Sequence, residues 1–261
     1  MKLKETVLLA STLVASAGAF AQAAAPAAPE PEYTLSYNVG LVTDYRYRGI
    51  SQTAKDPALQ GGIDYAHKSG WYIGTWGSTI KWIKDSSVPG FDAKGPVEVD
   101  IYGGYKGSFN DALSYDVGLL QYWYVGNKLG DVPGLKNANT LEIYGALTYN
   151  VFTLKYSHSL TTLFGTPNSS GSGYLDLSAA FDLGNGFSVT PHVGHQYIRH
   201  FGNYTDYSVT LAKDFGDGLS LSVAAVGTNW KSHFGFPYTL PGSGTEDLGK
   251  PGLVLGLKKT F

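Results

Sequence analysis

Apolar and polar residues alternate along most of the chain from residue 33 onward, and the alternation is clearest between Tyr33 and Arg48. In that segment almost all odd positions are Tyr, Leu or Val, whereas most even positions are small, polar or charged. Successive side chains of a strand point to opposite faces. The pattern therefore predicts a β-strand with one apolar face and one charged face.

Strands of this kind are predicted along the whole remainder of the chain. About twelve are expected, an even number, and each has about the 9–11 residues that a tilted membrane strand needs. Strands of soluble sandwiches are shorter, about 5–6 residues. The predicted strands cover residues 33–48, 57–68, 71–82, 97–108, 113–125, 140–149, 151–163, 173–183, 187–198, 204–214, 219–230 and 252–261.

The predicted connections alternate between short and long. Short ones lie near residues 68–70, 109–112, 150, 184–186 and 216–218, and longer ones near 49–56, 83–96, 126–139, 164–172, 199–203 and 231–251. Outer-membrane barrels have short periplasmic turns and longer external loops, whereas a soluble sandwich has no reason to sort its loops by length. The pattern predicts an all-β transmembrane antiparallel barrel, an up-and-down meander with both termini in the periplasm.

Aromatic residues gather at both ends of the predicted strands, as in the interfacial girdles of membrane barrels. A soluble protein would keep more of them mid-strand, in its core. Those beside short turns are Phe109, Tyr149, Phe152, Phe181, Phe187, Phe215 and Phe261, and those beside long loops are Tyr45, Tyr47, Trp82, Trp123, Tyr174, Tyr197, Tyr204 and Trp230.

Charged residues segregate to one face of the predicted strands. A charge facing the bilayer core is costly, and almost no mid-strand charge falls on the apolar face. The charges of the opposite face are expected to line the lumen, and they are Asp44, Arg46, Arg48, Asp64, Glu98, Asp100, Lys106, Asp116, Glu142, Lys155, Asp176, Asp206 and Lys258.

These lumen charges have two interpretations. Rings of side-chain charge set pore selectivity, and the excess of acidic residues then predicts a mild cation preference. Alternatively, the acidic and basic groups pair into a network that fills the lumen. About twelve strands give a lumen between those of filled small barrels and wide porins, so both an open and a plugged barrel are compatible with the sequence.

Arg46 and Arg48 lie two apart on the first predicted strand, near its external end. They would form a basic eyelet for anionic solutes or lipopolysaccharide phosphates. Pairing with Asp44, Asp64 and carboxylates of neighbouring strands is the favoured interpretation, because isolated charges in a lumen seek partners.

The first residues of the chain predict export. A basic start, an apolar stretch from about Val7 to Ala17 and a small-x-small motif ending at Ala21 indicate a signal peptide over residues 1–21. The apolar stretch is shorter than the roughly 20 residues of a membrane-spanning helix, which disfavours an anchor. Residues 22–32 are Ala/Pro-rich and predict a disordered lead-in, and residues 33–261 form the barrel domain.

Composition agrees with an exported barrel. The chain has no cysteine, so its stability depends on something other than disulfides, which a closed hydrogen-bonded barrel supplies. The net charge of −2 argues against nucleic acid as a partner.

The histidines offer no catalytic or metal arrangement, so we predict that the chain is not an enzyme and needs no cofactor or metal. Ser157 and Ser159 flank His158 and point away from it on a strand, unlike the His–Ser pair of outer-membrane phospholipases. His192 and His195 are three apart and also diverge, which argues against a metal pair.

The last strand ends at Phe261, after alternating apolar residues from Leu253 to Leu257. This ending resembles the signal that the outer-membrane assembly machinery reads. Lys259 departs from the pattern, although a lysine near the interface can snorkel. We expect Phe261 at the periplasmic rim, where the last strand closes against the strand that starts at Tyr33.

The stretch from Tyr37 to His67, with DYRYRGISQ (44–52) and PALQGG (57–62) as its most specific parts, resembles the proteobacterial TorF family of porin-like outer-membrane proteins, whose function is poorly defined. The resemblance covers the mature chain. It implies a porin-like barrel and no particular substrate or catalytic residue.

The sequence therefore predicts a passive channel for small hydrophilic solutes or ions in the outer membrane of a Gram-negative bacterium. Its expected partners are outer-membrane lipid, lipopolysaccharide, the barrel assembly machinery and the solutes themselves. The alternatives are a non-conducting surface protein whose loops bind partners and, less favoured, a lipid-modifying enzyme.

Overall fold

The structure, a computed structural model, describes residues 31–230 and 247–261. The predicted signal peptide, almost all of the Ala/Pro-rich lead-in and most of the last long loop lie outside the described residues. No helix of the described part is long and apolar enough to span a membrane. Two short 3₁₀ turns, Lys84–Ser86 and Leu129–Asp131, lie in the connections.

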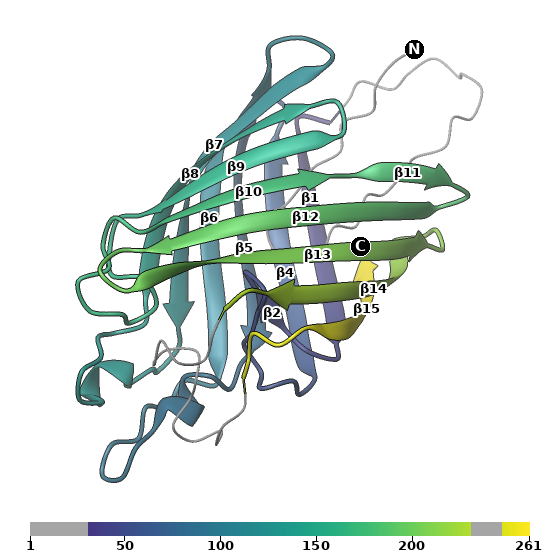
Figure 1. The fold of residues 1–261 in the computed structure, drawn as a ribbon. Helices are drawn as coiled ribbons and strands as arrows, with labels where there is room; N and C mark the ends of the chain where they lie inside the picture. Colours follow the sequence, from purple (N-terminus) through teal and green to yellow (C-terminus); the bar gives the residue numbers. More distant parts are fainter. Residues whose placement is uncertain (1–30, 231–246) are drawn as a thin grey trace, which may run out of the picture.

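Twelve antiparallel strands close into one barrel (Figure 1), which confirms the predicted fold. Each strand pairs with the next one along the ring, and β15 pairs with β1 to close it. The strands are β1 (Tyr33–Val42), β4 (Ala58–His67), β5 (Trp71–Thr79), β6 (Val97–Ser108), β7 (Leu113–Tyr124), β8 (Thr140–Tyr149), β9 (Phe152–Ser159), β10 (Gly173–Ala179) continued by β11 (Phe181–Gly184), β12 (Phe187–Ile198), β13 (Gly202–Asp214), β14 (Leu219–Thr228) and β15 (Gly252–Thr260).

Short turns lie at one end of the barrel, the short-turn end, and longer connections lie at the other, the long-loop end (Figure 1). Both ends of the barrel sequence, Tyr33 and Thr260, lie at the short-turn end. The predicted sorting is wrong for one connection: residues 199–201, between β12 and β13, form a tight turn rather than a long loop. The hydrogen bond from the Phe201 amide to the Ile198 carbonyl (3.0 Å) closes this turn.

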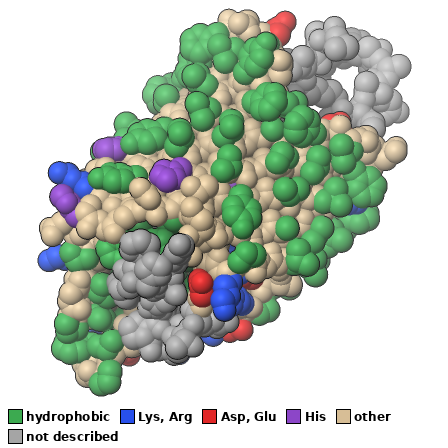
Figure 2. Space-filling view, in the orientation of Figure 1, with side chains coloured by type: hydrophobic (Ala, Val, Ile, Leu, Met, Phe, Trp, Pro, Cys, Tyr) green, Lys and Arg blue, Asp and Glu red, His purple; other side chains and the backbone are tan. Residues whose placement is uncertain are grey.

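The strand register places the apolar positions side by side on the outer face. Leu257 lies between Leu41 and Leu221 on the neighbouring strands, and all three side chains are about half exposed. Figure 2 shows such hydrophobic side chains distributed over the wall, with charged ones mainly near its ends. In water this surface would be costly, whereas in a bilayer it matches the apolar band of a membrane barrel.

The first strand is shorter than its alternation predicts. β1 ends at Val42 rather than at residue 48, and the chain then turns inward and forms a hairpin of β2 (Arg46–Tyr47) and β3 (Ile50–Ser51). Tyr47 pairs with Ile50, and the two residues between them, Arg48 and Gly49, have φ of 46° and 77°. Two successive positive φ values are typical of the type I′ turn that closes tight hairpins.

The chain segment that includes this hairpin, residues 44–53, is here called the luminal hairpin. Its residues are buried, except for the partly buried Tyr47, which places the segment inside the barrel. The sequence prediction of an exposed loop at residues 49–56 is therefore wrong for residues 49–53. Alternation alone does not reveal it, because a strand inside the lumen shows the same period of two as a strand in the wall.

A proline explains the interruption between β10 and β11. Pro191 lies within β12 and has no amide hydrogen to donate to the neighbouring strand. The pairs on either side, Ser178 with His192 and Phe181 with Val189, keep the same register. The amide of Ala180 instead bonds to the carbonyl of Val151 on the other side (2.9 Å). The wall is thus continuous across the break.

Tyrosines of the lumen lie over glycines of neighbouring strands. A Cβ at Gly194 would collide with the hydroxyl of Tyr174, and one at Gly118 with the hydroxyl of Tyr144. The missing side chains leave room for the large rings to lie flat along the wall and to carry their hydroxyls into the lumen.

We expect a charge to be much more costly on the outer face of β13 than on its inner face. Val209 is 51% exposed on the outer face. Val209→Arg should lower the free energy of unfolding in phospholipid vesicles by about 2–4 kcal/mol, because the charge would face the bilayer. The matched variant Thr210→Arg, one residue along on the inner face, should cost much less. Urea titration of both proteins in vesicles measures the difference, and equal losses would contradict the assignment of faces.

Candidate functional site

The luminal hairpin contacts strands around the whole ring. The ring of Tyr45 packs edge-on against Trp76 of β5, with ring centroids 5.5 Å apart. The hydroxyl of Tyr47 lies 2.5 Å from that of Tyr122 on β7. A Cβ at Gly49 would collide with Thr228 of β14, so glycine is required here for space as well as for its positive φ. The hairpin therefore crosses the lumen rather than lining one side of it.

Arg48, at the tip of the luminal hairpin, binds the wall opposite β1. Its guanidinium donates to both carboxylate oxygens of Glu142 on β8 (3.0 and 2.8 Å) and to Oε1 of Gln196 on β12 (2.6 Å). The guanidinium carbon also lies over the rings of Tyr47 and Tyr174, at 4.9 and 4.3 Å from their centroids. Arg48 is 4% exposed and Glu142 is 2% exposed. One guanidinium nitrogen, Nη2, contacts both oxygens of Glu142, and the other, Nη1, donates to Gln196, so together these charge-assisted bonds fix the position of the side chain.

A second arginine secures the base of the luminal hairpin. Arg46 Nε donates to Asp44 Oδ2 at 2.5 Å, and its Nη1 donates to the carbonyls of Leu248 (2.9 Å) and Lys250 (3.0 Å). Asp44 also accepts the hydroxyl of Ser51 (2.6 Å). The hairpin is thus joined both to itself and to the chain that leads into β15.

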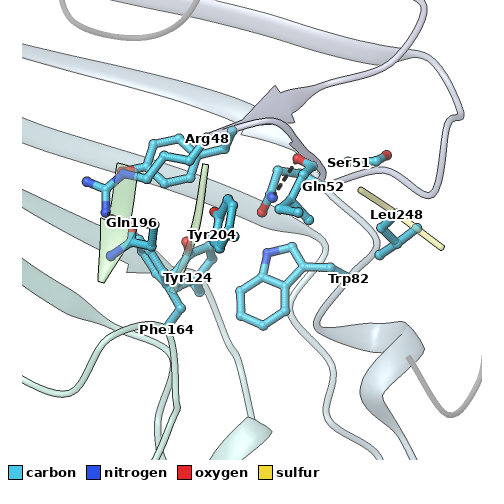
Figure 3. A pocket seen from close by; sticks show the side chains of 11 residues that line it. Arg48, Ser51, Gln52, Trp82, Tyr124, Phe164, Gln196, Tyr204 and Leu248 are labelled. Carbon is cyan, nitrogen blue, oxygen red and sulfur yellow. Dashed lines mark hydrogen bonds between the residues drawn. The ribbon is translucent and has the colours of Figure 1, made fainter. Parts of the chain in front are cut away.

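The hairpin and the long-loop half of the wall pack closely. They enclose a cavity of about 30 Å³, room for about one water molecule. Figure 3 shows the side chains around this cavity, with Trp82 and Phe164 on one side and Gln52 and Arg48 on the other. The indole Nε1–H of Trp82 is buried and has no hydrogen-bond partner among the described residues, which suits a single bound water.

The short-turn half of the lumen is more open. Lys106 and Asp116 form a 3.8 Å ion pair there and keep side-chain exposures of 29% and 22%. The hydroxyl of Tyr102 donates to Asp64 (2.5 Å), and that of Tyr72 donates to Asp116 (2.5 Å). Paired charges that still reach water line this half of the barrel.

Two aspartates flank a histidine between the two halves. His192 on β12 contacts Asp176 of β10 through Nε2 (2.5 Å), and its Nδ1 lies 3.7 Å from Asp206 of β13. The hydroxyl of Tyr174 donates to Asp206 (3.1 Å) beneath the guanidinium of Arg48. This group links the tip of the luminal hairpin to the more open half of the lumen.

The structure places the thirteen residues of the predicted lumen set in three regions. Asp44, Arg46 and Arg48 lie on the luminal hairpin, which corrects their placement on the first wall strand. The buried wall of the long-loop half holds Glu98, Asp100, Glu142 and Asp206, and the partly exposed remainder holds Asp64, Lys106, Asp116, Lys155, Asp176 and Lys258. Each of the thirteen residues is buried or only partly exposed.

The pairing interpretation of the two arginines agrees with the geometry in part. Arg46 pairs with Asp44, as expected. Arg48 pairs with Glu142, across the lumen, rather than with a carboxylate beside it. Asp64 contacts neither arginine and instead accepts the hydroxyl of Tyr102. A hairpin that leaves the wall brings together residues that a wall strand would keep apart.

Sequence reasoning missed the neutral members of this site. Gln196, Tyr122 and Tyr174 hold Arg48 or its partner, but no charge marks them. Gln196 and Tyr122 occupy inward positions of their strands, so the alternation places them in the lumen. The sequence does not show that Arg48, in the turn between β2 and β3, reaches them across the lumen.

The histidines lie as the alternation predicts. Ser157 and Ser159 are buried toward the lumen, whereas the ring of His158 lies near the hydroxyl of Tyr156 on the outer face (3.4 Å). His192 is inside the barrel, and His195 is outside with its Nδ1 near the Thr205 hydroxyl (2.9 Å). Among the described residues, no group of three or more His, Asp or Glu has a metal-binding arrangement.

One family model matches residues 24–261, and its description reads "Bacterial protein of unknown function (Gcw_chp)". No curated protein matches the chain in sequence. Among solved structures, the chain is similar to the KdgM porin, with a TM-score of 0.54 and 9% identity over 87% of this chain and 98% of that one. The NanC porin gives a TM-score of 0.51 and 9% identity over 87% and 99%. At these identities the likeness concerns the fold.

Removing one partner of the buried pair should be costly. Arg48→Ala leaves Glu142 buried without its cation, and we expect a loss of about 3–5 kcal/mol in the free energy of unfolding. The double variant Arg48→Met, Glu142→Leu should recover much of that loss, because it removes both charges. Lys68→Ala is the matched control: its pair with Glu32 is exposed and should contribute little. Equal stability of the Arg48→Ala variant and the wild type would show that the pair does not hold the hairpin.

Proposed function

The chain belongs to the Gcw_chp family of bacterial proteins of unknown function, and from its barrel we propose that it is an outer-membrane channel of the porin type, closed by the luminal hairpin in the conformation described here. One observation carries the proposal: a closed ring of twelve strands with apolar residues outside and paired charges inside. In such a barrel the backbone amides and carbonyls of the wall pair with those of neighbouring strands, so no unpaired polar group of the wall faces lipid, and the interior is polar.

The outer membrane of a Gram-negative bacterium is the location that suits this surface. The apolar outer wall needs lipid around it, and closed barrels are the β-structures that lipid tolerates. The KdgM and NanC porins, which share the fold, support the same location. The TorF-like stretch from Tyr37 to His67 fits the proposal, and the short-turn end would then face the periplasm. There Phe261 would serve as the assembly signal.

The luminal hairpin is the gate of the proposed channel. It fills the long-loop half of the lumen, whereas the charges of the other half keep contact with water. Conduction then requires the hairpin to move, and the contacts of Arg48 with Glu142 and Gln196 oppose that movement. The same close packing of the luminal hairpin also supports the competing proposal, a surface barrel that does not conduct.

Small hydrophilic solutes or ions, with a mild preference for cations, are the proposed cargo. Acidic side chains outnumber basic ones in the lumen set, and fixed negative charge attracts cations. The KdgM porin has a solved complex with disordered oligogalacturonate. We do not extend that anionic solute to this chain, since the charge balance of its lumen is the opposite of what an anion requires.

Conductance of the purified protein in planar lipid bilayers tests the channel. The wild type should give rare or small current steps, because the hairpin closes the lumen. Replacing residues 46–51 with a short Gly/Ser link should raise the step size by about tenfold or more, an estimate that treats the freed lumen as that of a barrel of intermediate width. Absence of current steps in both proteins, at any salt concentration, would contradict the channel and favour the surface barrel.

The reversal potential in a KCl gradient tests the cation preference. The hairpin-replaced protein should reverse on the cation-selective side, because the lumen wall retains its acidic excess. Lys155→Gln should increase the preference and Asp116→Asn should reduce it. An anion-selective reversal potential would refute this part of the proposal and leave the channel itself intact.

A further inference from the structure

Two carboxylates of β6, Glu98 and Asp100, face the lumen directly behind the luminal hairpin. They are two residues apart and so share one face of the strand. Glu98 is 1% exposed and Asp100 is 6% exposed. Both belong to the most deeply buried part of the lumen wall, where a charge is costly unless something compensates it.

Hydroxyl groups surround Glu98. Its Oε1 accepts the hydroxyl of Tyr45, from the luminal hairpin, at 3.0 Å. In the register Glu98 lies between Ser78 of β5 and Tyr124 of β7, both with hydroxyl groups. Hydroxyl groups at these positions can donate hydrogen bonds to a carboxylate.

Asp100 lacks such partners. It lies between Trp76 and Tyr122 on the neighbouring strands. Its Oδ1 is buried and has no hydrogen-bond partner among the described residues. Buried polar atoms without a partner are rare in native structures and each calls for an explanation, such as an ion or a water.

The nearby guanidinium of Arg48 already pairs with another carboxylate, that of Glu142. Asp100 interacts electrostatically with two other carboxylates, Glu98 and Glu142. Arg48 Nη2 contacts both oxygens of Glu142, and no described Lys or Arg forms an ion pair with Glu98 or Asp100. Three carboxylates therefore share one arginine in a nearly dry region, where either a bound cation or a proton would compensate their repulsion.

We propose that Glu98 and Asp100 together bind a hard inorganic cation, such as Ca²⁺ or Na⁺, in the lumen behind the luminal hairpin. The available donors are oxygens of carboxylates and hydroxyls, which are the ligands that such cations prefer. The cation would supply the missing positive charge and the missing partner of Asp100 Oδ1.

The site would also act on the gate. Tyr45 belongs to the luminal hairpin and donates to Glu98, so the cation and the hairpin share one carboxylate. A bound cation keeps Glu98 ionised and in place for that hydrogen bond. A role of the site in cation selectivity rests on the proposed channel function, whereas binding of the cation does not.

Binding is measured with Tb³⁺, a luminescent substitute for Ca²⁺ that nearby Tyr and Trp rings sensitise. Tyr45, Trp76 and Tyr122 surround the proposed site, so the folded wild type should give sensitised emission that Ca²⁺ displaces. Asp100→Asn and Glu98→Gln should each weaken Tb³⁺ binding by about tenfold or more, the factor that corresponds to 1.4 kcal/mol. Both variants keep the size of the side chain and so should still fold.

Asp64→Asn is the matched control, because Asp64 also faces the lumen but already accepts the hydroxyl of Tyr102. It should bind Tb³⁺ as the wild type does. The unfolding temperature in detergent gives a second readout: Ca²⁺ should raise it for the wild type and for Asp64→Asn, and not for Asp100→Asn.

Two results would overturn the proposal. One is Tb³⁺ emission that is absent or equal in all four proteins. The other is an Asp100→Asn protein more stable than the wild type at every Ca²⁺ concentration, with the wild type matching it only at acidic pH, since a shared proton would then supply the compensation.

A wild type that binds the cation but never conducts would contradict the proposed channel and leave the cation site intact. A conducting protein whose cation preference survives Asp100→Asn would defeat the selectivity role alone.

Discussion

Closure of the hydrogen-bonded ring is the constraint on which the rest of this structure depends. In a bilayer each unpaired backbone amide is costly, so an open sheet of this kind would not be stable there. The pairing of β15 with β1, from Val42 with Gly256 to Asn38 with Thr260, removes both free edges. The bond between the Phe261 amide and the Tyr37 carbonyl (2.8 Å) extends it to the last residue. Only a closed wall allows apolar residues outside and charges inside.

The closed wall creates a lumen that must itself be filled or hydrated. In this chain the two halves of the lumen differ in what fills them. The long-loop half is filled by the luminal hairpin, which brings two arginines and two tyrosines into the barrel. The short-turn half leaves its charged side chains partly exposed, and Lys106 and Asp116 pair there at 3.8 Å. This division underlies the proposal that the luminal hairpin acts as a gate above the more open half.

Pairing of opposite charges joins the luminal hairpin to the surrounding wall. Arg48 satisfies Glu142, and the tyrosines that surround it carry the remaining hydrogen bonds to Asp206 and Glu142. A buried polar network specifies one arrangement when each of its groups has a hydrogen-bond partner, and a buried group without a partner is energetically costly. Asp100 is the member left unsatisfied, which is why a cation at that position would complete the network rather than add to it.

The sequence by itself determined the barrel, because period-two alternation and the segregation of charge are local properties of each strand. It also placed Glu98, Glu142 and Asp206 on inward positions, since parity along a strand decides the face. The inward turn at residue 43 was decided only by the tertiary structure. Residues 43–48 alternate as a wall strand would, and the energetic reason to leave the wall lies in partners far along the chain, Glu142 and Gln196. Those contacts exist only once the ring has closed and has brought the opposite wall within reach of Arg48.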